Sequence, residues 1–344
     1  MLHELDRLRR GLTTLDTAGG ATAVVGAARV LADQMAEAGA LWLAFSTLGH
    51  ARLATTVAAV REAGLAMADQ AWVARSLGDL DTADELYEGV AAVGEKYGEP
   101  ELQARALLGR GVNFRVRGNY PKARTAFCRG LACAENAGLA DLQAIAHQGL
   151  LIAAITAGDS DTALVHGWAA YELARGNTDR EAELLINLSH VSMVAGYPEA
   201  ALRGFLSCLR RATGARFRLP SLGGAAVAAA RLGNSELVGT MARAAEESLV
   251  TVALPFESAS ALRSLSEAFE SIGQGSRAED YRLRARSLAR KNGFFEIVLA
   301  TEPKEAARPS APERRPLERA SLQVIESLEA MDAEVDATQL ALTP

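Results

Sequence analysis

Apolar residues recur along this chain at the three- and four-residue spacing of amphipathic helices, whereas runs that alternate every second residue are scarce. The segment from Ala104 to Gly138 shows this most clearly. It contains a helical stretch, a Gly-Asn-Tyr-Pro turn at 118–121, and a second helical stretch that ends at a glycine. The same unit recurs up and down the chain. The pattern therefore predicts an all-α protein made of antiparallel helix pairs.

A turn glycine, followed five residues later by a small residue or a valine, marks each repeat. Such turns occur at Gly78, Gly118, Gly158, Gly196, Gly233 and Gly273, at spacings of 37 to 40 residues. Gly39 begins a degenerate copy 39 residues before Gly78. A fixed period in this range, without a strand signal, is the signature of a helical solenoid.

Each part of the turn has a physical reason. The glycine is expected to adopt the left-handed conformation that ends a helix. Residues that bond to their own backbone in turns follow it, namely Asp79, Asn119, Asp159 and Asn234. Pro121 and Pro198 suit the first turn of the second helix, where no amide partner is needed. The small residue, for example Ala123, should be buried where two helices cross closely. Bulky residues follow it by four positions at Tyr87, Phe127 and Phe205.

The turn phrase, with Phe114 and Phe269 four residues before their turn glycines, resembles the tetratricopeptide repeat (TPR) family over roughly residues 20–292. The resemblance implies a TPR-like α-solenoid, a right-handed superhelix in which the first helix of each pair lines a concave, peptide-binding face. These repeats are longer than the standard unit of ~34 residues. In that respect they resemble the sensor portions of bacterial signalling proteins and transcriptional regulators.

The pattern divides the chain into four parts. Residues 1–64 hold a short helix at 2–16 and a degenerate first repeat with helices at 21–37 and 41–62, whose apolar residues include Trp42. Residues 65–300 hold six helix pairs, predicted at 65–77 and 80–97, 101–117 and 121–136, 140–157 and 161–175, 180–195 and 198–213, 220–232 and 235–250, and 256–272 and 276–291. An apolar clump at 294–299 is expected to cover the end of the stack. Residues 301–316 read as a Pro-rich linker, and 317–344 as an acidic amphipathic helix (317–335) and tail.

The fifth of these six pairs is expected to be the weakest. Pro220 and the Gly223-Gly224 sequence disfavour helix, so they predict a shortened first helix that begins near residue 220.

The charge and composition of the chain argue against several classes of function. The net charge of −6 gives no basic field for nucleic acid. Three cysteines in 344 residues argue for a reducing compartment. No segment approaches the ~18–20 apolar residues of a membrane span, and no signal peptide is visible. A cytoplasmic protein is therefore expected.

Residues that could carry catalysis are few. His147 and His166 fall on the paired helices of one repeat, where two polar histidines are favoured over a metal site. Cys128 and Cys133 lie on different faces of one helix and are expected to be packing residues. The GQGSRA phrase at 273–278 is a repeat turn, because a dinucleotide site needs a preceding strand. The sequence predicts no enzyme, no cofactor and no metal.

The TPR register assigns a set of residues to the predicted concave groove. They are Trp72, Arg75, Arg105, Val112, Arg115, Gln148, Ile152, Ile186, Asn187, His190, Arg231, Arg263 and Glu267. Their arginines favour a peptide or protein partner with acidic groups. The alternative is that these residues are only the solvated face of the first helices.

The favoured function is a non-enzymatic scaffold or adaptor that binds a protein or peptide through this groove, with homo-oligomerisation left open. The first alternative is a ligand- or peptide-responsive signalling or transcription-regulatory sensor that acts through another chain. A remoter one is an accessory subunit whose catalytic site forms at an interface. The amphipathic helix at 317–335 could dock near Arg231 and Arg263 as an internal mimic of the ligand, pack elsewhere on its own chain, or bind a second chain.

Overall fold

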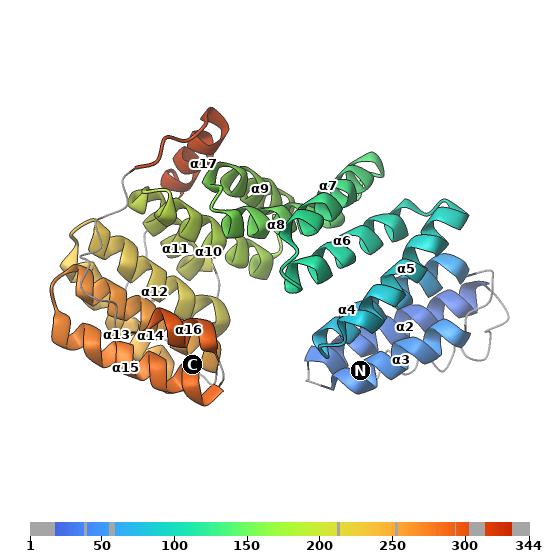
Figure 1. Cartoon of the computed structure of the whole chain (residues 1–344), viewed down its shortest axis with the longest axis horizontal. Coiled ribbons are helices and arrows are strands. Elements are labelled where there is room, and N and C mark those ends of the chain that lie inside the picture. The colour runs from blue at the N-terminus through green and yellow to red at the C-terminus, as the bar shows by residue number, and fades with distance from the viewer. Residues whose placement is uncertain are drawn as a thin grey trace. The chain divides into compact units, whose positions relative to one another are not determined.

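The structure, a computed structural model, describes residues 18–37, 40–54, 59–211, 214–251, 254–292, 294–302 and 314–331. In these ranges the regular structure consists of sixteen helices that pack in chain order (Figure 1). The predicted all-α solenoid is confirmed for the described residues. The helix predicted at 2–16 lies outside them.

The chain forms two compact units, residues 1–153 and 154–344, whose boundary falls inside α8. The first unit holds α2 (Ala18–Glu37), α3 (Leu41–Ala54), α4 (Val60–Ser76), α5 (Leu80–Tyr97), α6 (Pro100–Val116), α7 (Tyr120–Asn136) and most of α8 (Ala140–Ala157). The second holds α9 (Ser160–Leu173), α10 (Thr178–Val194), α11 (Pro198–Arg211), α12 (Ala215–Arg231), α13 (Ser235–Thr251), α14 (Pro255–Ser271), α15 (Gly275–Asn292), α16 (Phe295–Ala300) and α17 (Arg319–Glu329).

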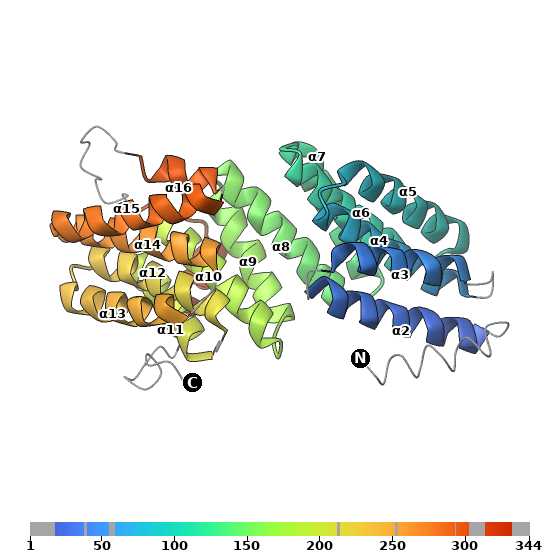
Figure 2. The same cartoon turned by 90° about the horizontal axis from the view of Figure 1, so that it is seen from below.

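The even-numbered helices from α2 to α14 are the first helices of the pairs, and the odd-numbered helices from α3 to α15 are the second helices. In the first unit, α4 contacts both α2 and α6, and in the second unit α12 contacts both α10 and α14 (Figure 2). Each of these first helices also packs against the second helix of its own pair. Within each unit the first helices therefore form a continuous layer, backed by the second helices.

The turn chemistry expected from the sequence is present. The six turn glycines have φ angles between +72° and +87°. The Asp79 carboxylate accepts a hydrogen bond of 3.0 Å from the backbone N–H of Thr82, which caps the N-terminus of α5. Asn119, Asp159 and Asn234 cap their second helices in the same way.

The core between repeats is built from an aromatic ring set against a glycine. Ala123 is fully buried, as predicted, and so is Phe127 one helical turn further along α7. Phe127 points at Gly149 of α8, where an added Cβ would lie 2.6 Å from the ring. Every extra carbon at such a position would have to displace close-packed atoms. A ring in a glycine-lined hollow thus fixes how one pair stacks on the next.

The expected shortening of the fifth pair is wrong, because α12 runs unbroken from Ala215 with Pro220 inside it. Its two glycines have a packing role. A Cβ on Gly224 would overlap the ring of Phe205, and one on Gly223 would lie 3.2 Å from the Cα of Ala261. The close contacts with α11 and α14 outweigh the poor helix propensity of glycine and proline.

The degenerate first repeat also differs from the prediction. Its second helix, α3, ends at Ala54 rather than at 62, and α4 already begins at Val60. Trp42 was expected to be one of the apolar residues that pack in this repeat, yet its exposed fraction is 70%. Leu41, Phe45 and Leu48 share the face of α3 that packs inward, and Trp42 is rotated off that face.

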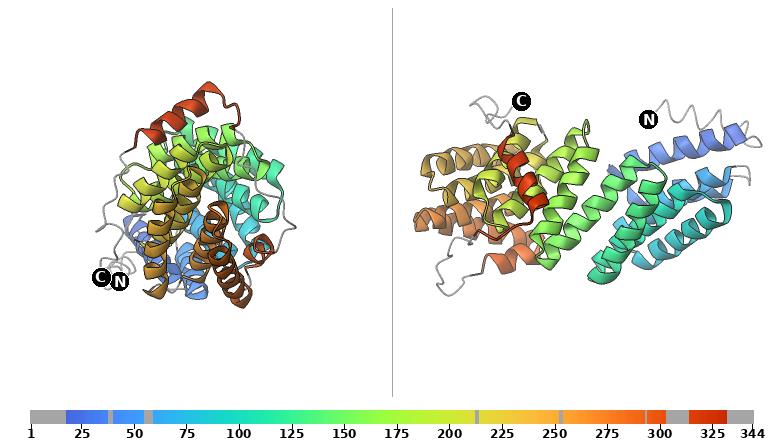
Figure 3. Two further views of the ribbon diagram at one scale, coloured as in Figure 1. Left: turned by 90° about the vertical axis from the view of Figure 1, so that its left-hand side faces the viewer. Right: turned by 90° about the horizontal axis from the view of Figure 1, so that it is seen from above.

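The two C-terminal helices pack on the second unit. The apolar clump at 294–299 contributes α16, which contacts α15 and α14 through Ile297 and Val298. Helix α17 lies across the second helices α9 and α11 (Figure 3, right). Its inner face buries Val324, Ile325 and Leu328.

The predicted docking of the C-terminal helix near Arg231 and Arg263 is therefore wrong for α17. Its N-terminus is held at the start of α9, where the backbone N–H of Glu318 donates a 2.8 Å hydrogen bond to the carboxylate of Asp161. The preceding residues bind the turn before α11. Arg315 donates its N–H to the carbonyl of Ala195 at 3.1 Å, and its own carbonyl accepts from the hydroxyl of Tyr197 at 3.2 Å. Among the alternatives, packing on its own chain is the one observed.

Candidate functional site

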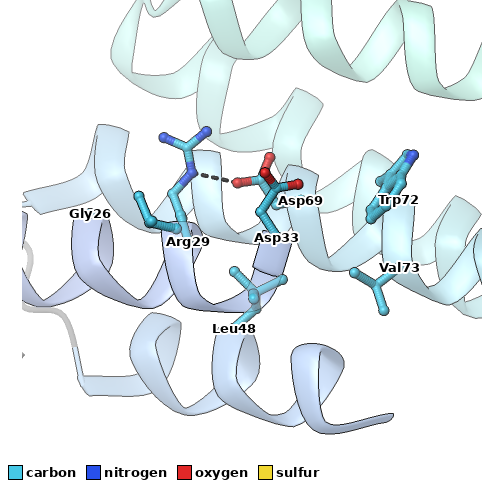
Figure 4. Close-up of a pocket in the computed structure, with 9 residues that line it drawn as sticks. Gly26, Arg29, Asp33, Leu48, Asp69, Trp72 and Val73 are labelled. Carbon is cyan, nitrogen blue, oxygen red and sulfur yellow. Dashed lines mark hydrogen bonds and ion pairs between the residues drawn. The ribbon is translucent and has the colours of Figure 1, made fainter. Parts of the chain in front are cut away.

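The described residues contain a pocket of about 590 Å³ on the first helices of the first unit (Figure 4). It lies between α2 and α4, with α3 contributing part of its base. Its lining consists of Gly26, Arg29, Val30, Ala32, Asp33, Leu48, Asp69, Trp72 and Val73. The size falls within the ~300–1,000 Å³ of ordinary ligand pockets.

The base of the pocket is apolar and buried. Ala32, Leu48 and Val73 each have an exposed fraction of 3% or less. Leu48 and Val73 belong to the hydrophobic core that joins α2, α3 and α4. The apolar lining residues that a bound side chain could contact are Val30 and Trp72, which are 40% and 42% exposed.

The charged groups of the pocket lie above this base. The Arg29 guanidinium pairs with the Asp69 carboxylate, which bridges α2 to α4. The exposed side chain of Asp33, one helical turn after Arg29, forms no hydrogen bond or ion pair with the described residues. With one arginine and two aspartates, the lining carries a net charge of −1.

Trp72 forms one wall. It lies three residues after Asp69, and therefore on the same face of α4. Its exposed fraction of 42% leaves a large aromatic surface open to solvent. In Figure 4 the two carboxylates lie between Arg29 and the indole.

Sequence reasoning identified Trp72 but missed Arg29, Asp33 and Asp69. The spacing of Asp69 and Trp72 on the predicted helix at 65–77 was a usable signal, because residues three apart share a face. Arg29 and Asp33, four apart on the predicted helix at 21–37, were another.

All the predicted groove residues lie on first helices, but those of the first unit differ in their surroundings. Arg75 donates hydrogen bonds to the hydroxyl of Tyr87 at 3.2 Å and to the amide oxygen of Asn113 at 3.4 Å. Arg105 binds Glu101 of its own helix at 3.0 Å. The side chain of Arg115 forms no hydrogen bond or ion pair with the described residues. Val112 packs against the core of α6, α7 and α8, and Gln148 and Ile152 are half-buried on α8.

Arginine pairing also fixes the pKa of Glu101. Burial alone would raise the pKa of this carboxyl, but Arg105 and Arg61 outweigh burial and lower the pKa below its ordinary value. Arg105 is thus part of an ion-pair network that joins α6 to α4.

In the second unit the predicted groove arginines share one acidic partner. Arg231 and Arg263 lie 3.3 Å and 3.9 Å from the carboxylate of Glu267, and Arg231 also donates to the carbonyl of Met193. His190 is exposed, with its ring edge-on to Phe205 at 5.0 Å. Asn187 and Ile186 are half-buried on α10. The structure therefore does not leave these arginines as free positive charges.

A second, smaller pocket of about 370 Å³ lies between α6 and α7. Lys122 and Arg110 flank the ring of Phe114 at 5.7 Å and 5.9 Å from its centre, and Arg129 also lines the pocket. Glu88 lies 3.4 Å from Arg110 and offsets part of this positive charge.

The candidate catalytic residues lie on three consecutive helices, α7 to α9. His147 lies on α8 in the first unit and His166 on α9 in the second. Cys128 is exposed, and burial raises the pKa of the half-buried Cys133 thiol. The described residues contain no group of three or more histidine, cysteine or acidic side chains that could hold a metal ion. Nor is any helix within them long and apolar enough to cross a membrane.

Comparison with known proteins supports the fold alone. No family model and no curated protein matches the sequence. Among solved structures, the chain superposes with a TM-score of 0.60 and 12% identity on a signal transduction ATPase with numerous domains (STAND) protein with a tetratricopeptide repeat sensor, from Pyrococcus horikoshii. The match covers 83% of this chain but only 46% of that one, so the chain spans about half of its length.

A looser superposition relates the chain to BtubC (BKLC) from P. vanneervenii. Its TM-score is 0.44 at 14% identity, over 90% of this chain and 94% of the other. The fold of the chain is thus similar to that of a protein with a tetratricopeptide repeat sensor.

Proposed function

We propose that this protein is a non-enzymatic binding module that recognises a protein or peptide segment on the first-helix layer of its first unit. The pocket between α2 and α4 receives one anchoring side chain of that segment. The observation that carries the proposal is the combination of an apolar, buried base with a half-exposed Trp72 beside it. Exposed aromatic residues next to well-packed pockets are typical anchors of protein interfaces.

Binding is favoured over catalysis by the composition of the pocket lining. The described residues that form it include no histidine, cysteine, serine or lysine, and of its two aspartates Asp69 is held in an ion pair with Arg29. The proposal therefore needs no cofactor and no metal, and it places the protein in the cytoplasm on the basis of its three cysteines.

The acidic partner expected from the sequence depended on free arginines along the groove. Arg75 and Arg105 are occupied by partners within the first unit, and Arg231 and Arg263 by Glu267 in the second. We therefore place the recognition chemistry in the α2–α4 pocket rather than along a basic groove.

The test is selection of a random-sequence peptide display library on the full chain. We expect an enriched motif with one dominant anchor residue, and loss of its binding in Trp72→Ala. Trp42→Ala is the matched control, because Trp42 is a more exposed tryptophan on α3 of the same unit and lies outside the pocket lining. Failure to enrich any motif, or equal binding by Trp72→Ala and the unaltered chain, would refute the proposal.

The sensor alternative stays a prediction. Its support is the fold likeness to a protein whose tetratricopeptide repeat part is named a sensor. A selected peptide that changes the hydrogen exchange of helices outside α2–α4 would favour it over a rigid scaffold.

A further inference from the structure

The charge pattern of the α2–α4 pocket indicates which side chain it accepts. We propose that the pocket binds the positively charged side chain of an arginine or lysine in the bound peptide. This inference rests on the proposed function and adds the chemical class of the anchor. It reverses the acidic preference that the sequence alone favours.

The two aspartates of the pocket differ in whether they already have a cationic partner. Asp69 already has a cationic partner in Arg29. Asp33 lines the same pocket and has neither a hydrogen bond nor an ion pair with the described residues. Asp33 is exposed to solvent, so a guanidinium or ammonium group that entered the pocket could pair with it and neutralise the net charge of −1. Charge-assisted hydrogen bonds of this kind are stronger than neutral ones.

Trp72 lines the pocket where its indole can attract a cation. An indole attracts cations more strongly than the other aromatic side chains when the cation lies over its face. Trp72 lines the pocket together with Asp33 and Asp69, and its exposed surface is not covered by another part of the first unit. A carboxylate and an indole in one hollow together favour a cation over a neutral apolar group.

The apolar part of the pocket lining also suits an arginine or lysine side chain. Arginine and lysine have long hydrocarbon stems that pack on apolar surface while their charged heads stay near polar groups. Val30, an aliphatic lining residue with an exposed fraction of 40%, offers such a surface beside Trp72. Arg29 limits the attraction, because its positive charge shares the pocket with the incoming group.

Trp72 can report binding directly, since the chain has three tryptophans and two of them can be removed. We would use the full chain with Trp42→Phe and Trp168→Phe, and titrate it while measuring the emission of Trp72. The probes are blocked seven-residue glycine–alanine peptides with a central arginine, lysine, citrulline or glutamate. Citrulline has nearly the shape of arginine without its charge.

We expect a saturable change in Trp72 emission with the arginine and lysine peptides. The citrulline peptide should bind at least about 10-fold more weakly, since it lacks the charge-assisted bond. Asp33→Asn should remove most of this difference. Arg29→Gln, which leaves the pocket with two uncompensated carboxylates, should tighten binding of the arginine peptide. Asp141→Asn is the matched control, because this exposed aspartate on α8 makes the same charge change outside the pocket.

Equal binding of the arginine and citrulline peptides, or no effect of Asp33→Asn, overturns the inference. Preference for the glutamate peptide with loss in Arg29→Gln overturns it too and assigns the pocket to anions through Arg29. These results leave the proposed function intact if library selection yields a Trp72-dependent motif with another anchor. Absence of any Trp72-dependent motif defeats the proposed function itself.

Discussion

The ring of Phe205 on α11 lies against the backbone of Gly224 on α12, in the space that a Cβ at residue 224 would occupy. The same relationship joins Tyr87 to Gly109 and Phe127 to Gly149. In each case a fully or nearly fully buried ring of a second helix meets a glycine of the next first helix. The distance between neighbouring repeats is therefore set by aromatic rings that pack against the backbone of glycines.

Gly224→Ala should destabilise the second unit. The overlap with Phe205 is expected to cost ~1–3 kcal/mol, as in other overpacked cores. This exceeds the gain of up to ~1 kcal/mol that alanine brings to a helix. The free energy of unfolding, measured by urea denaturation, should fall.

Gly239→Ala is the matched control for that substitution. Gly239 lies inside α13, and a Cβ there would meet nothing within 4 Å. The same chemical change should raise stability by ~0.5–1 kcal/mol. Equal effects at the two glycines would contradict the role given to Phe205.

The repeat register was predictable because it depends on local chemistry. The left-handed glycine at each turn and the capping side chains after it act within four or five residues, so the sequence reveals them directly. The helix over 215–231 was not predictable in this way. Its Pro220 and two glycines are tolerated because of contacts with Phe205 and Ala261, which lie 19 and 37 residues from Gly224 and thus in other helices.

The candidate site, like the fold, was predictable only where it depends on residues close together in the sequence. The helix register placed Trp72 on the first-helix face, but it gave no information on the charge state of that face. Whether an arginine there is free depends on a partner in another helix, such as Asn113 for Arg75 and Asp69 for Arg29. The repeat register indicates which side chains share a face of a helix. Only the packed structure shows which of these side chains already have a partner.

Arg75→Met should destabilise the first unit, although the sequence assigned Arg75 to ligand binding. Its loss leaves the hydroxyl of Tyr87 and the amide oxygen of Asn113 without this donor, and both residues are buried. Such a loss is expected to cost ~1–3 kcal/mol. Urea denaturation would measure it.

Arg115→Met provides the comparison, since Arg115 lies on the next first helix and its side chain forms no ion pair or hydrogen bond with the described residues. Its effect should stay within ~0.5 kcal/mol. A larger loss at Arg115 than at Arg75 would contradict the assignment of Arg75 to the framework of the fold.

Glu101 should make the stability of the first unit depend on pH in the acid range. Its folded-state pKa is lowered below the ordinary value of 4.5, since Arg105 and Arg61 outweigh burial. A depressed pKa means that the stabilisation is fully present above the unfolded-state pKa and is lost as the pH falls through the folded-state pKa. Denaturation midpoints should therefore show Glu101→Gln to be less stable than the unaltered chain at pH 7, with the gap closing below pH 4.5.

Glu135→Gln is the control for this pH series. Glu135 is exposed on α7, and its side chain has no ion pair with the described residues. The gap between Glu135→Gln and the unaltered chain should change less over this range than the gap for Glu101→Gln, because Glu135 has no ion pair with the described residues to lose. A constant gap for Glu101→Gln over the same range would show that its ion pairs do not stabilise the fold.

Helix α17 should detach when its apolar face is broken. An isolated helix of 11 residues is only marginally stable in water, so α17 depends on its contact with α9 and α11. Leu328 is fully buried in that contact, and Leu328→Asp would place a charge there. Hydrogen exchange of the amides at 319–329 should then approach the rate of an unfolded segment.

Gln323→Asp places the same charge on the exposed face of α17 and should leave exchange unchanged. In Leu328→Asp, protection should also fall in α9 and α11, because both helices lose a packing partner. Protection in α14, which carries Arg263, should remain, since α17 lies on the second helices and not beside that residue. If amides at 319–329 stayed protected in Leu328→Asp, or if only α14 lost protection, the docking of α17 on α9 and α11 would be wrong.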